Sequence, residues 1–298
     1  MDNKSFFILF IDILSWLSAK KSLTLRKLSV LGMTKSKILF INQEMIPYVG
    51  ETELSVIGKE LPKLSQESGA EIRTFMPKWG TINERRGQLH EVIRLSGMNI
   101  IINDSDHPLI IKVASIPQTR VQVYFIDNED YFAKRLMSAD SNGKEYDDNG
   151  ERAVFFARGV LETVKKLRWA PDVIHCQGWM AAVAPLYVKT AYREEPSFAE
   201  TKVITSLFNN DLKQGFSNDF KACIEFKDAN NKVLGAYPDN MSPDDVYRMA
   251  IDFSDGIIEA GSQVDPALLE YAEKKGKPVL RNTGENLIAA CKDFYESI

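Results

Sequence analysis

From residue 37 onward, short apolar runs alternate with longer stretches in which apolar positions recur at a helical period. The short runs lack polar alternation, which is typical of strands buried on both faces of a parallel sheet. Strands are therefore predicted at residues 37–42, 71–76, 91–95, 110–115, 121–126, 172–176, 202–207 and 256–259. Helices are predicted at residues 53–67, 151–168, 179–192, 243–254 and 266–275.

This alternation of strands and helices predicts an α/β fold with a doubly wound, mainly parallel sheet and right-handed crossovers. Residues 91–126 interrupt the alternation and are predicted to form an inserted antiparallel β-meander. The polar, turn-rich residues 138–152 are predicted to form a surface loop. Ligands of such sheets bind beyond the carboxyl ends of the strands. Candidate binding residues are therefore expected at 42–54, 175–180 and 207–216.

Composition excludes several classes of protein. The chain has 298 residues, a formal net charge of −4 and 44% hydrophobic residues, which fits a soluble globular protein with one large domain or two small ones. This charge gives no support to nucleic-acid binding, which usually needs a basic face. The three cysteines and three histidines have no metal-ligand spacing. We therefore expect a reduced, cytoplasmic protein without disulfides, metal site or cofactor.

The N-terminus carries a separate apolar stretch, FFILFIDILSWL at residues 6–17, followed by basic residues. Twelve residues are too few to cross a bilayer. The charge order is also opposite to that of a signal peptide. Two interpretations remain, a membrane-surface helix or a tail that precedes the native start at Met33. The second is preferred, so that 1–32 is an extension and 33–298 is the folded domain.

Six segments, taken in chain order, carry a resemblance to a known family. They are NQEMIPYVGETELSVIGKELPKL (42–64), MPKWG (76–80), VYFIDNEDYF (123–132), YDDNGERAVFFARGVLE (146–162), PDVIHCQGW (171–179) and LFNNDLKQGF (207–216). Together they resemble the N-terminal domain of bacterial glycogen synthases and plant starch synthases, which form glycosyltransferase family 5. Each motif alone is weakly specific, but six collinear motifs over about residues 36–260 are a specific signal.

The resemblance implies a Rossmann-like domain, one half of the two-domain GT-B architecture, and an activity that transfers glucose from ADP-glucose to an α-1,4-glucan. It implies that Asn210, Gln214, Gly215, Asn149 and Arg152 line the substrate cleft. It assigns no catalytic residue and no metal ligand to this chain. The expected ligands are an α-glucan or a nucleotide sugar.

The turn that opens the first helix departs from the family pattern. In the family, a lysine and two glycines of this turn lie against the diphosphate and the transferring glucose. Here those positions are Gly50, Thr52 and Glu53, with Glu51 between them. Two unit charges about 6 Å apart repel by roughly 2–3 kcal/mol at an effective dielectric constant near 20. One carboxylate beside a diphosphate is therefore expected to weaken binding by about tenfold to a hundredfold.

Two further substrate-facing positions differ. The family's histidine in its H-N pair is Asn209 here, whereas the following asparagine is kept as Asn210. At the position of the acidic residue in the family's H-D-W motif, this chain has Gly178. After Glu259 about forty residues remain, enough for a helix, the run KPVL and a closing helix, so the family's second domain is expected to be absent.

Three functional hypotheses follow. The chain is a glycogen/starch synthase-like domain with little activity alone, a non-catalytic protein that binds glucan or regulates glycogen metabolism, or the acceptor half of a split enzyme whose partner is a second Rossmann-domain chain. Simpler structural roles are also open. His175 fits a core histidine, Glu51 and Glu53 fit acids of a first helical turn, and Asn149 with Arg152 fits a helix start.

Overall fold

The apolar runs form a ten-stranded sheet in the computed structural model, which describes residues 35–209 and 212–298. The strands are β1 (Lys37–Asn42), β2 (Glu71–Pro77), β3 (His90–Glu91), β4 (Met98–Ile102), β5 (Ser105–Ser115), β6 (Gln122–Asp127), β7 (Val173–Gln177), β8 (Lys202–Leu207), β9 (Gly256–Glu259) and β10 (Val279–Leu280). Their order is β10-β9-β8-β7-β1-β2-β6-β5-β3, and β4 pairs with β5 outside this path.

All neighbouring strands from β10 to β6 are parallel, and β5 runs antiparallel to β3, β4 and β6. This confirms the mainly parallel sheet and the inserted antiparallel meander. The chain leaves β1 in one direction through β2 and β6 and continues on its other side with β7, β8 and β9. The order therefore reverses between β1 and β7, which is where ligands of open α/β sheets bind.

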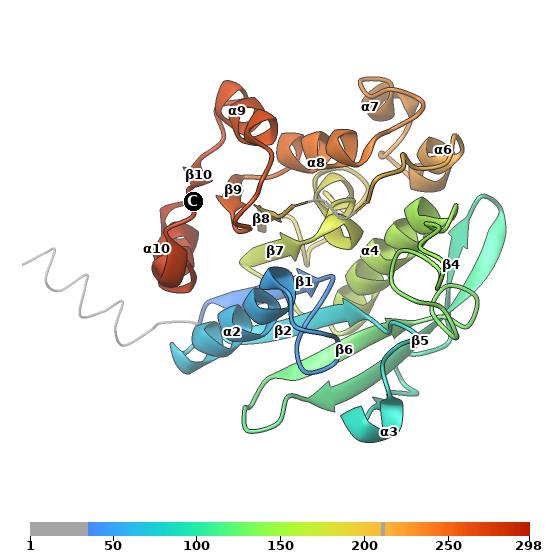
Figure 1. The fold of residues 1–298 in the computed structure, drawn as a ribbon, viewed down its shortest axis with the longest axis horizontal. Helices are drawn as coiled ribbons and strands as arrows, with labels where there is room; N and C mark the ends of the chain where they lie inside the picture. The colour runs from blue at the N-terminus through green and yellow to red at the C-terminus, as the bar shows by residue number, and fades with distance from the viewer. Residues whose placement is uncertain (1–34, 210–211) are drawn as a thin grey trace, which may run out of the picture. The chain divides into compact units, whose positions relative to one another are not determined.

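The helices cover both faces of the sheet (Figure 1). They are α2 (Glu53–Glu67), α3 (Glu84–Gly87), α4 (Asn149–Lys166), α5 (Ala184–Lys189), α6 (Phe220–Ile224), α7 (Asn231–Leu234), α8 (Pro243–Asp252), α9 (Pro266–Lys274) and α10 (Leu287–Ser297), with short 3-10 turns at Trp179–Ala181 and Gly284–Asn286. Helices α2 and α10 pack side by side, whereas α5 packs against both α4 and α8. None of the described helices is long and apolar enough to cross a bilayer.

The closing helix α10 packs on the sheet. A side chain at Gly256 of β9 would collide with Phe294 and Ile298, so the helix lies directly on this strand. The hydroxyl of Tyr295 is 2.6 Å from Nδ1 of His175 in β7. The prediction that a final helix follows a short KPVL strand is therefore confirmed. The predicted extension at residues 1–32 lies outside the described residues.

Several predicted elements were wrong in extent. The strand predicted at 110–115 begins earlier, at Ser105, and α4 begins at Asn149, inside the loop predicted at 138–152. The strand predicted at 91–95 ends at Glu91, because Leu95 N–H donates to the Val92 carbonyl at 2.8 Å and closes a turn. The Oγ of Ser96 then accepts from the Ile111 amide of β5 at 3.0 Å, in place of a ladder bond. The helix predicted at 179–192 divides into a 3-10 turn and α5, since Pro185 in the first turn of α5 has no amide hydrogen to continue a preceding helix.

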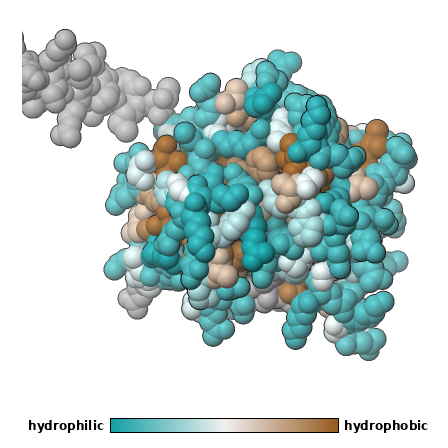
Figure 2. Space-filling view, turned by 90° about the horizontal axis from the view of Figure 1, so that it is seen from above, coloured by the Kyte–Doolittle hydropathy of each residue, from teal (hydrophilic) through white to brown (hydrophobic). Residues whose placement is uncertain are grey.

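Seen from above in Figure 2, the surface is mainly hydrophilic, and its hydrophobic side chains form separate spots. Isolated apolar residues are normal on a protein surface. This face therefore offers no broad apolar patch.

Candidate functional site

The turn after β1 is built around a buried carboxylate. Glu44 is only 4% exposed, although it lies two residues beyond the end of β1. One of its oxygens accepts from Gln43 Nε2 at 3.0 Å, and the other accepts from the hydroxyl of Thr52 at 2.8 Å. Hydrogen bonds of this kind offset the cost of burying a charge. The turn is thereby tied to the start of α2.

The first turn of α2 is capped by its own residues. Thr52 Oγ1 accepts from the Ser55 amide at 3.0 Å, and Ser55 Oγ accepts from the Thr52 amide at 2.8 Å, which completes a capping box. Glu53 Oε2 accepts from the Ser262 amide in the loop after β9 at 3.0 Å. Glu53 is a first-turn acid as predicted, whereas Glu51 precedes the cap and is exposed. The N-terminus of α2, where an anion could bind, is therefore flanked by the carboxylates of Glu51 and Glu53.

Gly178, at the end of β7, has a conformation and surroundings that suit only glycine. Its φ is +84°, and an added Cβ would lie 2.6 Å from Gln43 Oε1 and 2.9 Å from Leu54 Cδ1. The same Gln43 Oε1 accepts from the Met180 amide at 3.3 Å. The side chain of Gln43 therefore fills the space beside Gly178 that an acidic side chain would need.

Three of the predicted site residues come together. Asn149, Gln214 and Gly215 line one cavity of about 200 Å³ beyond the sheet's carboxyl edge. The Glu145 carboxylate accepts from the amides of Lys213 at 2.7 Å and Gln214 at 3.1 Å. The surface loop before α4 is thus hydrogen-bonded to the loop after β8.

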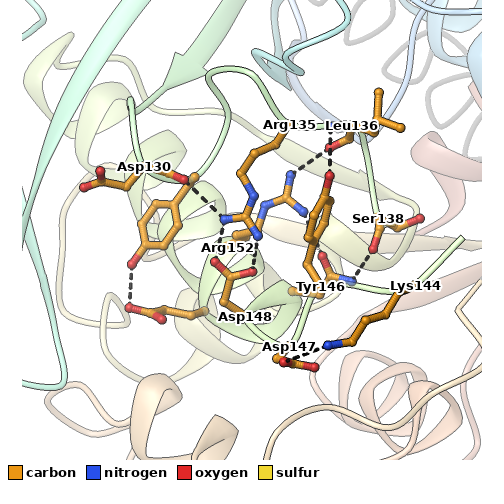
Figure 3. Close-up of polar contacts among 12 residues, drawn as sticks. Asp130, Arg135, Leu136, Ser138, Lys144, Tyr146, Asp147, Asp148 and Arg152 are labelled. Atoms are coloured by element: carbon orange, nitrogen blue, oxygen red, sulfur yellow. Dashed lines mark hydrogen bonds and ion pairs between the residues drawn. The ribbon is translucent and has the colours of Figure 1, made fainter. Parts of the chain in front are cut away.

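Arg152, the fourth described site residue, does not line this cavity. Figure 3 shows its guanidinium group among its polar neighbours, beside Arg135 and Tyr146. Its side chain is fully buried, and it donates to the Met137 carbonyl at 2.7 Å and to Asn149 Oδ1 at 2.8 Å. Burial lowers its pKa to about 10, with the neighbouring Arg135 adding repulsion. Arg135 itself forms a bidentate pair with Asp148 at 2.7 and 2.6 Å. Asn149 Nδ2 donates to the Ser138 carbonyl at 2.8 Å.

The fifth predicted site residue, Asn210, lies outside the described residues. Its neighbour Asn209 is exposed and lines a second cavity of about 430 Å³, together with Asp244 and Asp265 at the starts of α8 and α9. Burial and then the charge of Asp265 raise the pKa of Asp244. A third cavity, of about 580 Å³, lies between the first turn of α2 and the start of α10.

His175 is a core residue, as its place at the end of a buried strand predicts. It is fully buried, with Nε2 2.6 Å from Ser206 Oγ and Nδ1 2.6 Å from Tyr295 Oη. Burial lowers its pKa to about 3, so the ring is neutral at physiological pH. Within 35–209 and 212–298, no group of three or more His, Cys, Asp or Glu side chains is arranged to hold a metal ion.

Sequence reasoning did not single out Gln43 and Glu145. The signal for Gln43 was its position in the first motif, where the family has a small serine and this chain has a long amide. The role of Glu145 had no local signal, since its partners Lys213 and Gln214 lie 68 and 69 positions away.

Comparisons with known proteins show the family to which the chain belongs. The family model described as the starch synthase catalytic domain matches residues 37–263. The glycogen synthases of Chlorobium limicola and Chlorobaculum tepidum are 38% and 37% identical over 174 residues, which is 58% of this chain and 36% of each relative. The match thus spans about a third of the length of these relatives.

A solved structure, the catalytic domain of starch synthase IV from Arabidopsis thaliana bound to ADP and acarbose, superimposes with a TM-score of 0.66 at 17% identity. The match covers 85% of this chain and 52% of that one, and it shows the fold, a GT-B half. The family model covers well over half of the chain, and the six motifs lie along the matched region. The chain therefore belongs to the starch synthase catalytic domain family.

Proposed function

We propose that this domain binds an α-glucan and, by itself, transfers glucose from ADP-glucose weakly or not at all. The observation that carries the proposal is the first turn of α2, where Thr52 and Ser55 cap the helix and Glu53 binds the Ser262 amide. A diphosphate at this turn would meet the carboxylates of Glu51 and Glu53, while Gly50 stands at the position of the family's lysine and Thr52 and Glu53 stand at those of its two glycines. The resulting repulsion, roughly 2–3 kcal/mol per carboxylate, opposes both binding and departure of the diphosphate.

The glucan half of the proposal is supported by the cavity between the Glu145 loop and the loop after β8. Polar groups of Gln214 and Asn149 and the rings of Tyr146 and Phe216 line it, which is the mixture of hydrogen-bonding and apolar surface that binds sugars. The starch synthase IV structure carries acarbose as well as ADP. Gln214 and Gly215 are proposed as glucan contacts, with Asn149 and Arg152 holding the cavity wall. The three buried, free cysteines suit the reducing cytoplasm in which we propose that the protein works.

The transfer reaction is tested with radiolabelled ADP-glucose and glycogen. We expect incorporation at background for the purified chain and no saturable binding of ADP in calorimetry. The combined variant Gly50→Lys/Glu53→Gly restores the cationic position and one glycine, and we expect it to show saturable binding of ADP in the same measurement. Incorporation well above background by the unaltered chain contradicts the inactive half of the proposal.

Glucan binding is tested separately by electrophoresis through gels that contain glycogen. We expect the chain to be retarded and Gln214→Ala to lose most of the retardation. Gln122→Ala, on the exposed start of β6, is the matched control and should migrate as the unaltered chain does. Equal migration in gels with and without glycogen would refute glucan binding.

The second candidate is the acceptor half of a split enzyme. It is favoured by the three cavities near the carboxyl edge of the sheet, because their polar linings suit a facing domain as well as a small ligand. Affinity purification from the native cells should then recover a second Rossmann-domain chain, and adding that chain should raise glucose incorporation. Repeated recovery of this protein alone would count against the candidate.

A further inference from the structure

Strand β4 leaves one edge of its hairpin unpaired. It joins β5 through a two-residue turn, Asn103–Asp104, in which both φ angles are positive at 48° and 61°. In such a turn the closing pair, Ile102 with Ser105, shares the ladder hydrogen bonds, so alternate residues of β4 face β5. The main-chain groups of Asn99 and Ile101 therefore face away from the hairpin.

The contacts of this edge agree with that assignment. The Ile101 carbonyl accepts from Nη1 of Arg158 on α4, which lies on the side of β4 away from β5. Among the described residues, the amides of Asn99 and Ile101 and the carbonyl of Asn99 have no hydrogen-bond partner. An unpaired row of this kind is a template for a further strand.

A groove of about 680 Å³ runs beside the edge, between β4, helix α4 and the segment around α6. Figure 1 shows these three elements next to one another. Arg158 forms part of the wall, is 5% exposed, and stacks over the Phe226 ring at 3.8 Å, while its Nε has no partner among the described residues. Ile101 projects its side chain outward and is 56% exposed.

Charge defines what this groove accepts. Asp104, Glu162 and Glu225 line it, whereas Arg158 is its one cationic lining residue. Arg158 is already engaged by the Ile101 carbonyl and the Phe226 ring. The carboxylates of Asp104 and Glu225 form no ion pair with any described residue. Opposite charges across an interface favour the correct partner and speed its association.

We propose that this groove binds an extended, basic peptide segment of another protein, which adds as a strand to the free edge of β4. The amides of Asn99 and Ile101 and the carbonyl of Asn99 supply hydrogen bonds, as in other cases of strand addition, while the Ile101 carbonyl stays with Arg158. The carboxylates of Asp104 and Glu225 bind lysine or arginine side chains, and Ile101 packs against an apolar residue between them. This interaction is independent of the cavity that we propose for glucan.

The probe is the peptide acetyl-KVKVKVK-amide with a fluorescent label, followed by polarisation and by NMR shifts of the protein's amides. We expect saturable binding with shifts at Asn99 and Ile101. The peptide acetyl-KVKPKVK-amide should bind at least tenfold more weakly, because proline interrupts the added strand. The peptide acetyl-EVEVEVE-amide should not bind.

Two protein variants separate the groove from general attraction between charges. Ile101→Pro removes an outward-facing amide without a ladder bond to β5, and Asp104→Lys/Glu225→Lys reverses the groove charge; each should weaken binding at least tenfold. Glu270→Lys/Glu296→Lys changes the net charge equally at exposed sites on α9 and α10 and should bind normally. Thermal melting confirms that each variant is folded. Equal binding by all variants, binding of the glutamate peptide, or self-association of the protein through β4 in place of peptide binding would overturn the proposal.

Discussion

At the scale of single residues, the site depends on a pair of positions that fit one another. Gln43 Oε1 accepts from the Met180 amide and its Nε2 donates to Glu44, so its side chain is fixed on both sides. Gly178 leaves the space that this side chain occupies. The glycine at 178 and the long amide at 43 therefore depend on each other, because an acidic side chain at 178 would occupy the space that Gln43 fills.

Gly178→Asp should destabilise the protein by about 2–4 kcal/mol, because it adds a charged side chain at a positive φ in a buried, filled space. Gln43→Ser in the same chain should recover part of this loss, since it removes the colliding Oε1 atom and the rest of the long amide, although the Cβ stays. A double-mutant cycle from urea unfolding measures the coupling. Strictly additive losses would show that the two positions do not share this space.

The cap of α2 gives a second prediction. Thr52→Ala removes the acceptor of the Ser55 amide and a donor to Glu44, and should lower the free energy of unfolding by about 1–2 kcal/mol. Thr52→Ser keeps the hydroxyl and should stay within about 0.5 kcal/mol of the unaltered chain. Both values come from urea unfolding. A loss of the same size in the serine variant would show that the methyl group of Thr52, and not its hydroxyl, provides the stabilisation.

At the scale of elements, local sequence patterns predict most strands and helices, whereas hydrogen bonds between residues distant in the chain position the loops. The strands β1, β8 and β9 and the helix α2 have the bounds that the sequence predicts, because each is an apolar or amphipathic run between polar turns. Strand β4 was missed because its turn uses Asn103–Asp104 rather than a glycine-containing pair.

The site was predictable only in part for the same reason. Motif order located Gln214 and Asn149, which do line one cavity. What closes that cavity is the bond of Glu145 to amides of the loop after β8, and what occupies the α2 turn is the bond of Glu53 to Ser262, 209 positions away. Such pairings follow from the assembled sheet, and the chain near either residue gives no sign of them.

Arg152 joins the Leu136–Met137 segment to α4, and the segment's carbonyls depend on it. Arg152→Lys keeps a charge but has no second nitrogen to bind the Leu136 carbonyl while the first binds Met137 and Asn149, so we expect a loss of about 2–3 kcal/mol in urea unfolding. Arg135→Lys, at a more exposed ion pair, is the control and should cost less than about 1 kcal/mol. Full stability of Arg152→Lys with lost glycogen binding would instead indicate a direct sugar contact.

At the scale of the whole molecule, α10 and the centre of the sheet are joined through one histidine. His175 of β7 contacts Ser206 of the next strand, β8, and Tyr295 of α10, so its hydrogen bonds join two central strands to a helix 120 positions away. Its pKa of about 3 means that folding excludes the proton that the unfolded chain would take up near pH 6.5. Lowering the pH therefore lowers the free energy of unfolding of the domain through this side chain.

The sign and size of this effect can be stated. Between pH 6.5 and pH 3 the unfolded chain binds a proton at His175 and the folded chain does not, so the free energy of unfolding falls as the pH falls through this window. From pH 7.5 to pH 5 this one group should remove roughly 2 kcal/mol. His175→Gln keeps an amide that can bond to Ser206 and Tyr295 but cannot titrate. The stability difference between the two proteins, measured by urea unfolding at each pH, should shrink by about that amount, whereas a constant difference would mean that His175 is not held neutral by burial.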